Sequence, residues 1–189
     1  LDMIARGAIT SPFITLTEDL VDLNELFNLY WRRIMPLGKT SSVAYPFSRL
    51  HNEPFWKLIP LHDKELSALA INNVTSVSQL RTLALGACMD DDLFYFLNHP
   101  ESRTFLRESL FQSCFSEQAI ASLKEQTAVN DNAYSYSLEL EQRSHLPLVE
   151  ETLTEYKYKP DVRDQAFRRI VVNTYDHRCA LCGIRIVTP

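Results

Sequence analysis

The clearest hydrophobic pattern in the chain is helical and lies between residues 16 and 36. Thr17 is suited to cap the start of a helix here, and Pro36 is suited to end it. In the stretch LTEDLVDLNELFNLYWRRIMP, apolar residues recur at steps of three and four and would form one face of that helix. These residues are Leu20, Leu23, Phe27, Tyr30 and Ile34.

The next stretch, LGKTSSVAYPFSRLHNEPFWKLIPL, has a different pattern. Its prolines and its glycine exclude a long helix. The runs SVAY and FWKLI are short enough to be strands. We therefore expect a loop-rich β element near residues 43–60, with the Tyr-Pro-Phe sequence in a loop, packed as a small wing against the preceding helix.

Helical periodicity returns between residues 76 and 127. A helix over SVSQLRTLALGACM would begin at Ser76 or Ser78, and a helix over DDDLFYFLNHP would begin at an aspartate cap and end before Pro100. SEQAIASLKEQTA predicts a further short helix. SRTFLRESLFQSCF predicts a helix whose apolar side carries Leu106, Leu110 and Phe115.

Residues 128–163 are more polar and are typical of a linker that contains one helical segment. They lead to RDQAFRRIVVNTY, which predicts a basic amphipathic helix. The fold class expected from these patterns is mainly α with a small β element, in a winged-helix-like arrangement.

The charges of the chain are unevenly distributed. The net charge is −5, which by itself does not favour binding to nucleic acid. Residues 1–60 carry 6 basic and 6 acidic groups, residues 61–155 carry 6 and 15, and residues 156–189 carry 7 and 3. The two ends of the chain could therefore bind a polyanion, although residues 61–155 are acidic.

Cysteine usage and the absence of a leader indicate a cytoplasmic protein. No apolar run approaches the roughly 20 residues that cross a bilayer, and no secretory signal is present. Cys88 and Cys114 stand singly in apolar surroundings and are expected to be buried, reduced thiols. The chain opens on LDMIARG, without an initiator Met and in a pattern typical of a helix end capped by Gly7, so we expect an internal piece of a longer protein.

The sequence RCALCG, residues 178–183, has the form of half a zinc site. Cys179 and Cys182 can aim two thiolates at one point, and the following glycine relieves the turn; Zn²⁺ requires four ligands in a tetrahedron. A redox dithiol is the alternative, but that role favours a pair at the start of a helix after a buried strand. We therefore expect structural zinc, bound only by a half-site and substoichiometrically in this chain.

The stretch FRRIVVNTYDHRCALCGIRI resembles the opening of the HNH nuclease module. The resemblance covers about 25 residues and implies the start of a ββα-metal fold over residues 164–189, which would be incomplete here. In that family the catalytic His follows the cysteines, so it would lie beyond Pro189, and His177 is expected to be a solvated turn residue. The resemblance implies an HNH-type DNA endonuclease that uses a divalent metal, and a fragment that does not cut DNA.

The stretch AYPFSRLHNEPFWKL, with the helical segments on either side, resembles the sulfur-binding domain of phosphorothioate-dependent HNH restriction endonucleases. The resemblance extends over most of residues 1–117, with residues 118–163 as the linker to the nuclease module. It implies the reader part of a type IV-like bacterial defence enzyme that binds phosphorothioated double-stranded DNA. The matching residues, in the family's order, are Tyr45, Pro46, Phe47, Leu50, Asn52 and Trp56.

The residue types in this stretch suit a sulfur-bearing phosphate. Sulfur is larger and more polarisable than oxygen and a poor hydrogen-bond acceptor, so an apolar cup formed by Tyr45 and Pro46 would favour it over an oxygen that must lose its hydration. Basic groups would hold the remaining charge and the flanking phosphates. The candidates for these contacts are Arg49, His51 and Lys57 nearby and, more distantly, Arg32, Arg33 and Arg81.

Two departures from the family and two other functions stay open. Relatives tend to carry a small residue where Arg49 stands, so the cup would be narrower or Arg49 would turn to a phosphate. Relatives also carry a His- and Pro-containing segment before the first helix that contributes to binding; we expect this segment to be either missing or disordered here, with a loss of affinity. The alternatives are an HNH nuclease that reads another modification or plain DNA, and a helical protein-interaction domain with a structural zinc knuckle, in which Tyr-Pro-Phe is only a packed turn. The sequence also leaves the oligomeric state open, including a homodimer.

Overall fold

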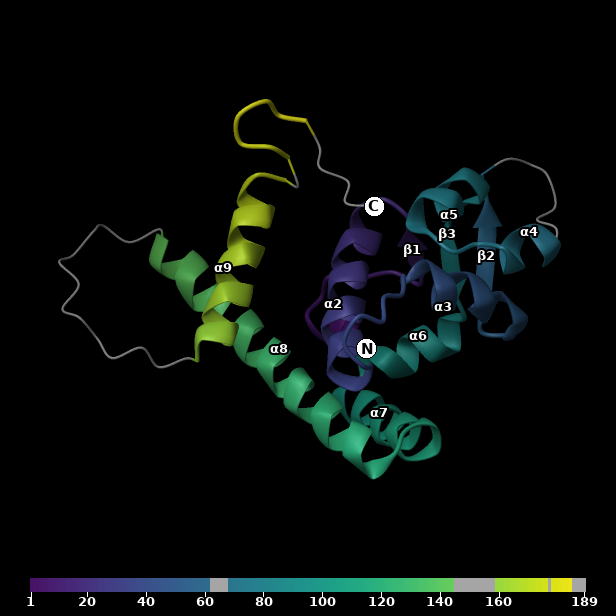
Figure 1. The fold of residues 1–189 in the computed structure, drawn as a ribbon, viewed down its shortest axis with the longest axis horizontal. Helices are drawn as coiled ribbons and strands as arrows, with labels where there is room; N and C mark the ends of the chain where they lie inside the picture. Colours follow the sequence, from purple (N-terminus) through teal and green to yellow (C-terminus); the bar gives the residue numbers. More distant parts are fainter. Residues whose placement is uncertain (62–67, 145–158, 177, 185–189) are drawn as a thin grey trace. The chain divides into compact units, whose positions relative to one another are not determined.

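The computed structural model describes residues 1–61, 68–144, 159–176 and 178–184. Within these ranges the chain is mainly helical and carries a small antiparallel sheet (Figure 1), which confirms the coarse prediction from sequence. Contacts between residues divide the chain into two compact units, Leu1–Ser122 and Leu123–Thr188.

The first unit begins with α1 (Asp2–Ala5), β1 (Phe13–Thr15) and the long helix α2 (Glu18–Ile34). It continues with α3 (Ala44–Arg49), the 3-10 turn η1 (Leu50–Asn52), β2 (Trp56–Pro60) and α4 (Ala68–Asn72). Next come α5 (Val77–Leu83), β3 (Ala84–Met89), α6 (Asp91–Asn98) and α7 (Pro100–Cys114). Helix α8 (Glu117–Ser144) crosses the boundary, and α9 (Pro160–Thr174) belongs to the second unit.

The sheet has the order β1-β3-β2, and both strand pairs are antiparallel. Ile14, Ala87 and Leu58 form one row across it, and all three are buried, so this face covers the core. On the opposite face, Gly86 lies where a Cβ atom would come within 2.3 Å of the Ile14 carbonyl oxygen and 2.8 Å of the Phe13 ring. This close approach requires a glycine at position 86.

The core of the first unit joins the sheet to the helices around it. Leu20 of α2 is buried, and Leu23 and Phe27 pack against the same cluster, as the helical pattern predicts. Phe47 of α3 and Leu80 of α5 are also buried in it. Figure 1 shows β2 and β3 side by side, with α3 and α5 next to them.

Several helix ends fall where the sequence places them. Gly7, with φ of +67°, ends α1: its N–H donates to the Ile4 carbonyl oxygen at 3.1 Å. Ser76 caps α5 in a reciprocal arrangement with Gln79, and Asp90 accepts two backbone N–H bonds at the start of α6. Thr17 occupies the cap position of α2, although its hydroxyl makes no capping hydrogen bond.

Three expectations about local structure were wrong. SVAY is not a strand, and Tyr-Pro-Phe is not in a loop: both fall at α3, which accommodates Pro46 because its first turn needs no N–H donor there. ALGACM is not the second half of a helix but the central strand β3. Pairing with strands on both sides outweighs its helix-like composition. FWKLI does form a strand, β2, as predicted.

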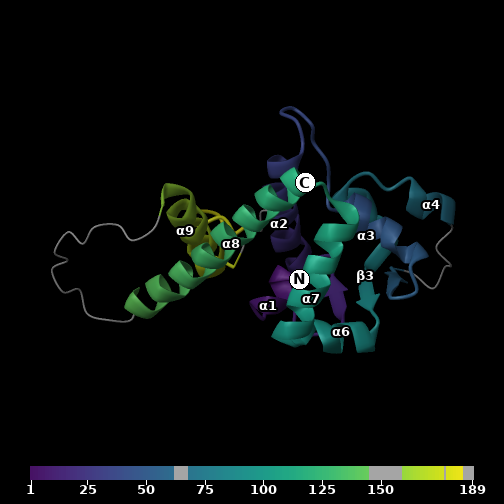
Figure 2. The same cartoon turned by 90° about the horizontal axis from the view of Figure 1, so that it is seen from below.

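The helices that follow are longer and more exposed than expected. Helices α6 and α7, both labelled in Figure 2, are joined at His99, which is the C-cap of α6 and the N-cap of α7. On α7, Leu106 packs partly against the core, whereas Leu110 is exposed and Cys114 is an exposed free thiol rather than a buried one. The short helix expected over SEQAIASLKEQTA continues to Ser144.

The second unit is built on the pairing of α8 with α9, which both views show (Figures 1 and 2). Ala133, Val162 and Ala166 form a small buried cluster between the two helices. The side-chain amide oxygen of the buried Asn130 accepts hydrogen bonds from the side chains of Gln126 on α8 and Gln165 on α9. Helix α9 contains the basic amphipathic segment that the sequence predicts. Of the helices in the described ranges, none has the length and apolar composition that crossing a membrane requires.

Candidate nucleic-acid interface and cysteine knuckle

Three of the predicted contact residues lie together on α3. Tyr45 and Pro46 are exposed in its first turn, and Arg49 follows one turn later. Residues four apart share one side of a helix, which brings the Arg49 side chain to Tyr45. We call Tyr45, Pro46 and Arg49 the α3 surface.

Arg49 stacks on the Tyr45 ring, with Cζ 3.9 Å from the ring centroid. Its Nη2 also donates a hydrogen bond to the Asn72 carbonyl oxygen at the end of α4, at 3.1 Å. The remaining terminal nitrogen, Nη1, is buried and has no hydrogen-bond partner. The guanidinium thus gives the α3 surface a positive charge directly beside two rings.

The backbone that carries the α3 surface is held by buried contacts. The Trp56 indole N–H donates to the Phe47 carbonyl oxygen at 2.9 Å, and the two rings meet edge to face with centroids 5.1 Å apart. The Ser48 hydroxyl, which is fully buried, donates to the Tyr45 carbonyl oxygen at 3.2 Å. The Trp56 bond ties α3 to β2, and the Ser48 bond lies within α3; together they hold the backbone that carries the α3 surface.

His51 lies directly after α3, in η1, and one of its ring nitrogens bonds to the backbone of α3. Its Nδ1 is 2.7 Å from the Ser48 carbonyl oxygen, a distance that identifies this ring nitrogen as the donor. The residue is half-buried. Asn52, another residue of the family pattern, donates to the Arg49 carbonyl oxygen at 3.2 Å.

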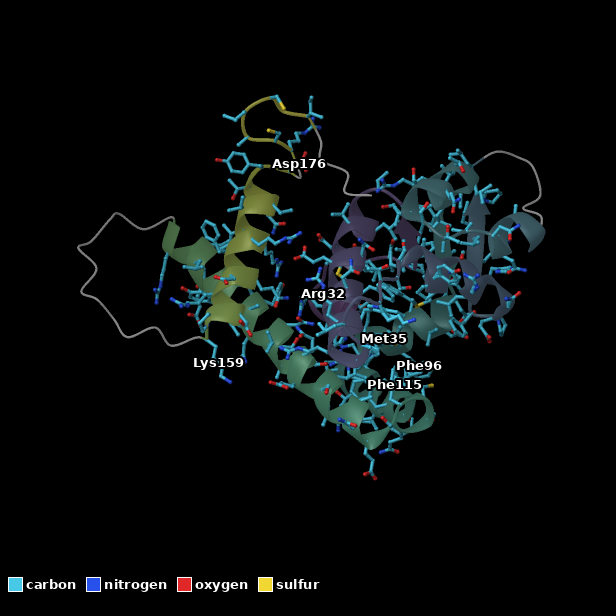
Figure 3. All side chains as sticks on the ribbon, in the orientation of Figure 1. Arg32, Met35, Phe96, Phe115, Lys159 and Asp176 are labelled. Carbon is cyan, nitrogen blue, oxygen red and sulfur yellow. The ribbon has the colours of Figure 1, made fainter. Side chains whose placement is uncertain are left out.

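The other predicted arginines come from different helices. Arg32 and Arg33 are exposed in the last turn of α2, where Figure 3 labels Arg32. Arg81 on α5 is half-buried, and its Nε donates to the Leu16 carbonyl oxygen at 2.7 Å. Burial lowers the pKa of Arg81. Arg81 therefore already ties α5 to the segment between β1 and α2, whereas Arg32 and Arg33 remain at the surface.

The cysteine knuckle follows α9, beyond the turn at which Figure 3 labels Asp176. The Cys179 N–H donates to the Ile184 carbonyl oxygen, and the Gly183 N–H donates to the Cys179 carbonyl oxygen, both at 2.8 Å. Gly183 has φ of +68°, so the glycine does relieve the turn, as expected from the sequence. His177 lies outside the described residues.

The backbone of the knuckle also favours the thiolate form of one cysteine, Cys179. Hydrogen bonds from the backbone N–H groups of Cys182 and then Leu181, together with the Cys182 thiol, lower the pKa of Cys179. Thiolates are the form of cysteine that binds zinc. Cys179 and Cys182 therefore fit two of the four ligands of a tetrahedral zinc site. Among the residues that the structure describes, no group of three or more His, Cys, Asp or Glu side chains is placed to hold a metal ion.

Sequence reasoning missed the arginine–tyrosine stack and the contact with Asn72. The spacing of Tyr45 and Arg49 would have indicated the stack if α3 had been recognised as a helix. The contact of Arg49 with the Asn72 carbonyl oxygen joins segments 23 residues apart and has no local signal. No family model matches the chain, and no curated protein or solved structure matches it.

Proposed function

We propose that this chain is the reader of a modification-dependent HNH endonuclease and that its α3 surface binds phosphorothioated double-stranded DNA. The observation that carries the proposal is the Arg49 guanidinium stacked on Tyr45 beside the exposed Pro46. A phosphorothioate group is an anion that also carries a weakly hydrated sulfur atom. The α3 surface offers a cation, Arg49, and the rings of Tyr45 and Pro46 within about one helical turn. The resemblance of residues 1–117 to sulfur-binding domains agrees with this use.

The chemistry of the ligand explains why rings are useful. A sulfur atom in place of a phosphate oxygen is a poor hydrogen-bond acceptor, so it loses little when it leaves water for the edge of Tyr45 or Pro46. An oxygen at the same place loses its hydration without compensation. The charge that remains on the group, and the neighbouring phosphates, are held by arginines whatever atom is present. We assign Arg32, Arg33 and His51 to those backbone contacts.

The second unit would connect this reader to the nuclease. We propose that residues 164–189, which include most of α9 and the knuckle, form the start of a ββα-metal module, and that the first unit serves as a winged-helix-like reader. Cys179 and Cys182 would hold a structural zinc ion, which would fix the fold of the module. Cleavage also requires a general base and a catalytic metal site, and in the HNH family both come after the knuckle. The cutting activity is therefore proposed for the complete protein, in the cytoplasm of a bacterium.

A gel-shift experiment with duplexes of one sequence tests the proposal. The duplexes are plain, methylated on a base, or phosphorothioated at one step, and binding is measured at two salt concentrations because phosphate contacts depend on salt. We expect the phosphorothioated duplex to bind most tightly and the plain duplex to bind weakly. Preference for the methylated duplex would identify a reader of another modification. Absence of binding to all three would support a protein-interaction domain instead.

A further inference from the structure

Arg49 is held from two sides in a position where it covers the Tyr45 ring. Its Cζ lies 3.9 Å from the ring centroid, and its Nη2 donates to the Asn72 carbonyl oxygen at 3.1 Å. The part of the side chain over the ring is the planar guanidinium, not the aliphatic stem. One face of Tyr45 is therefore occupied by a cation rather than open to an apolar ligand atom.

The protein does not satisfy all the hydrogen-bond donors of this guanidinium. Nη1 is buried and unpartnered, whereas the Nε of Arg81, a nearby arginine of the same unit, is paired with the Leu16 carbonyl oxygen. A buried donor without an acceptor is unfavourable, and an anionic oxygen placed beside it would supply the strongest kind of acceptor. A sulfur atom would supply a poor one. The unpaired Nη1 donor of Arg49 thus favours oxygen over sulfur as its acceptor, and a phosphate reaches it only when the side chains that bury it move aside.

We infer that Arg49 determines the selectivity of the α3 surface, by binding phosphate oxygen and covering the face of Tyr45 that sulfur would otherwise contact. This inference rests on the proposed function and adds to it. Tyr45 and Pro46 favour a sulfur-bearing group, while Arg49 favours charge and oxygen, so the two preferences oppose each other. The consequence is that the natural chain discriminates less between phosphorothioated and plain DNA than the same surface would without the Arg49 charge.

The test measures affinities of the 189-residue chain for a plain duplex and for the same duplex with one phosphorothioate. Arg49→Gln removes the charge and keeps a polar side chain, but this side chain is shorter than arginine and also loses the Nη2 hydrogen bond to the Asn72 carbonyl oxygen. We expect it to weaken plain-duplex binding about tenfold, the loss typical of one charge-assisted hydrogen bond, and phosphorothioate binding by less. The ratio of the two affinities should therefore rise. Arg49→Lys keeps the charge and should stay closer to the natural chain on plain DNA.

Two controls separate this effect from a loss of fold or of net charge. Urea unfolding of Arg49→Gln shows whether the tie between α3 and α4 is needed for stability. Arg143→Gln removes an equal charge from an exposed position on α8 and should leave the ratio of affinities unchanged.

The outcomes distinguish the inference from the function on which it rests. If the natural chain prefers the phosphorothioated duplex and folded Arg49→Gln shows an unchanged or lower ratio, the inference is wrong and the proposed function stands. If the natural chain binds both duplexes equally and Arg49→Gln prefers the phosphorothioated one, the inference holds. The proposed specificity of the natural chain for phosphorothioated DNA is then wrong. If neither protein binds DNA, both proposals are wrong.

Discussion

The indole N–H of Trp56 and the carbonyl oxygen of Phe47 form a hydrogen bond between β2 and α3 at 2.9 Å, inside the core. Both side chains are buried, and their rings meet edge to face. Because Phe47 follows Pro46 directly, this bond fixes the backbone from which Tyr45 and Pro46 project. A contact in the core thus determines the geometry of the proposed binding surface.

Trp56→Phe should lower the free energy of unfolding by about 1–3 kcal/mol, because the buried Phe47 carbonyl oxygen loses its donor. Urea unfolding followed by circular dichroism measures the change. Trp31→Phe is the matched control: the Trp31 indole also donates to a carbonyl oxygen, that of Lys39, at 2.9 Å, but in an exposed position where water can replace it. Equal losses for the two variants would show that burial of the Trp56 bond is unimportant.

Tyr45→Ala and Pro46→Ala should each weaken binding of the phosphorothioated duplex by roughly 1–3 kcal/mol, the scale of one specific contact. Binding of the plain duplex should change little, because arginine contacts with phosphates do not depend on the sulfur. Fluorescence anisotropy with both duplexes measures the two effects. Tyr95→Ala removes an exposed tyrosine from α6 and serves as the control. Equal losses on both duplexes would mean that Tyr45 and Pro46 only support the fold.

Asp2→Asn should destabilise the first unit by about 1.5–3 kcal/mol, since hydrogen bonds to a charged group are stronger than neutral ones. The Asp2 carboxylate is buried and accepts hydrogen bonds from Tyr30 of α2 and Arg107 of α7, so it joins three helices. Urea unfolding of Asp2→Asn, Tyr30→Phe and the double variant gives the coupling between the two residues. Asp92→Asn, at an exposed position, should change stability by less than about 0.5 kcal/mol. A similarly small effect at Asp2 would contradict the role of this cluster.

Cys179 should become reactive at a lower pH in the folded chain than in urea. Backbone N–H groups of Cys182 and Leu181 lower the pKa of Cys179, so its thiolate persists in the folded chain at pH values where an ordinary thiol is protonated. The stabilisation of the folded knuckle that accompanies this thiolate is lost as the pH falls through the lowered pKa. Alkylation by iodoacetamide over a pH series, read by peptide mass spectrometry, gives a midpoint for each cysteine. In urea the midpoint of Cys179 should rise; the same midpoint in the folded chain and in urea would refute the prediction.

Zinc should bind weakly and at less than one equivalent in this chain, because the described residues offer only the two thiols of the knuckle. Competition with a chromogenic chelator measures the affinity, which should fall with decreasing pH as protons compete for the thiolates. Cys179→Ser and Cys182→Ser should each remove the remaining binding, whereas Cys114→Ser should not. Tight equimolar binding would show that His177 or another residue outside the described ranges completes the site.

Local signals in the sequence predicted the parts of the fold that depend on neighbours along the chain. Ser76 and Asp90 mark helix starts because their side chains bond to backbone N–H groups two or three residues later. The segment Ala84–Met89 was wrongly predicted as helix because its small apolar residues are compatible with both helical and strand periodicity. It is a strand because it pairs with β1 and β2, which are distant in sequence. A prediction of helix from local composition takes no account of those partner strands.

The candidate site was predicted as a set of residues but not as an arrangement. The sequence identified Tyr45, Pro46 and Arg49 by type and order, yet placed them in a loop. Their geometry depends on α3, which begins with a proline in its first turn, and on the Asn72 carbonyl oxygen from another helix. The second dependence is a tertiary contact, which no local pattern encodes.

The close approach at Gly86 has a consequence for the variation that the chain can accept. Even alanine would bring a methyl carbon against the Ile14 carbonyl oxygen of the neighbouring strand, which cannot move without breaking the sheet. In a library that samples every amino acid at every position, position 86 should therefore retain only glycine among the folded clones. Gly38, where an added Cβ would meet no atom within 4 Å, should be limited only by its φ of +85° and should admit asparagine.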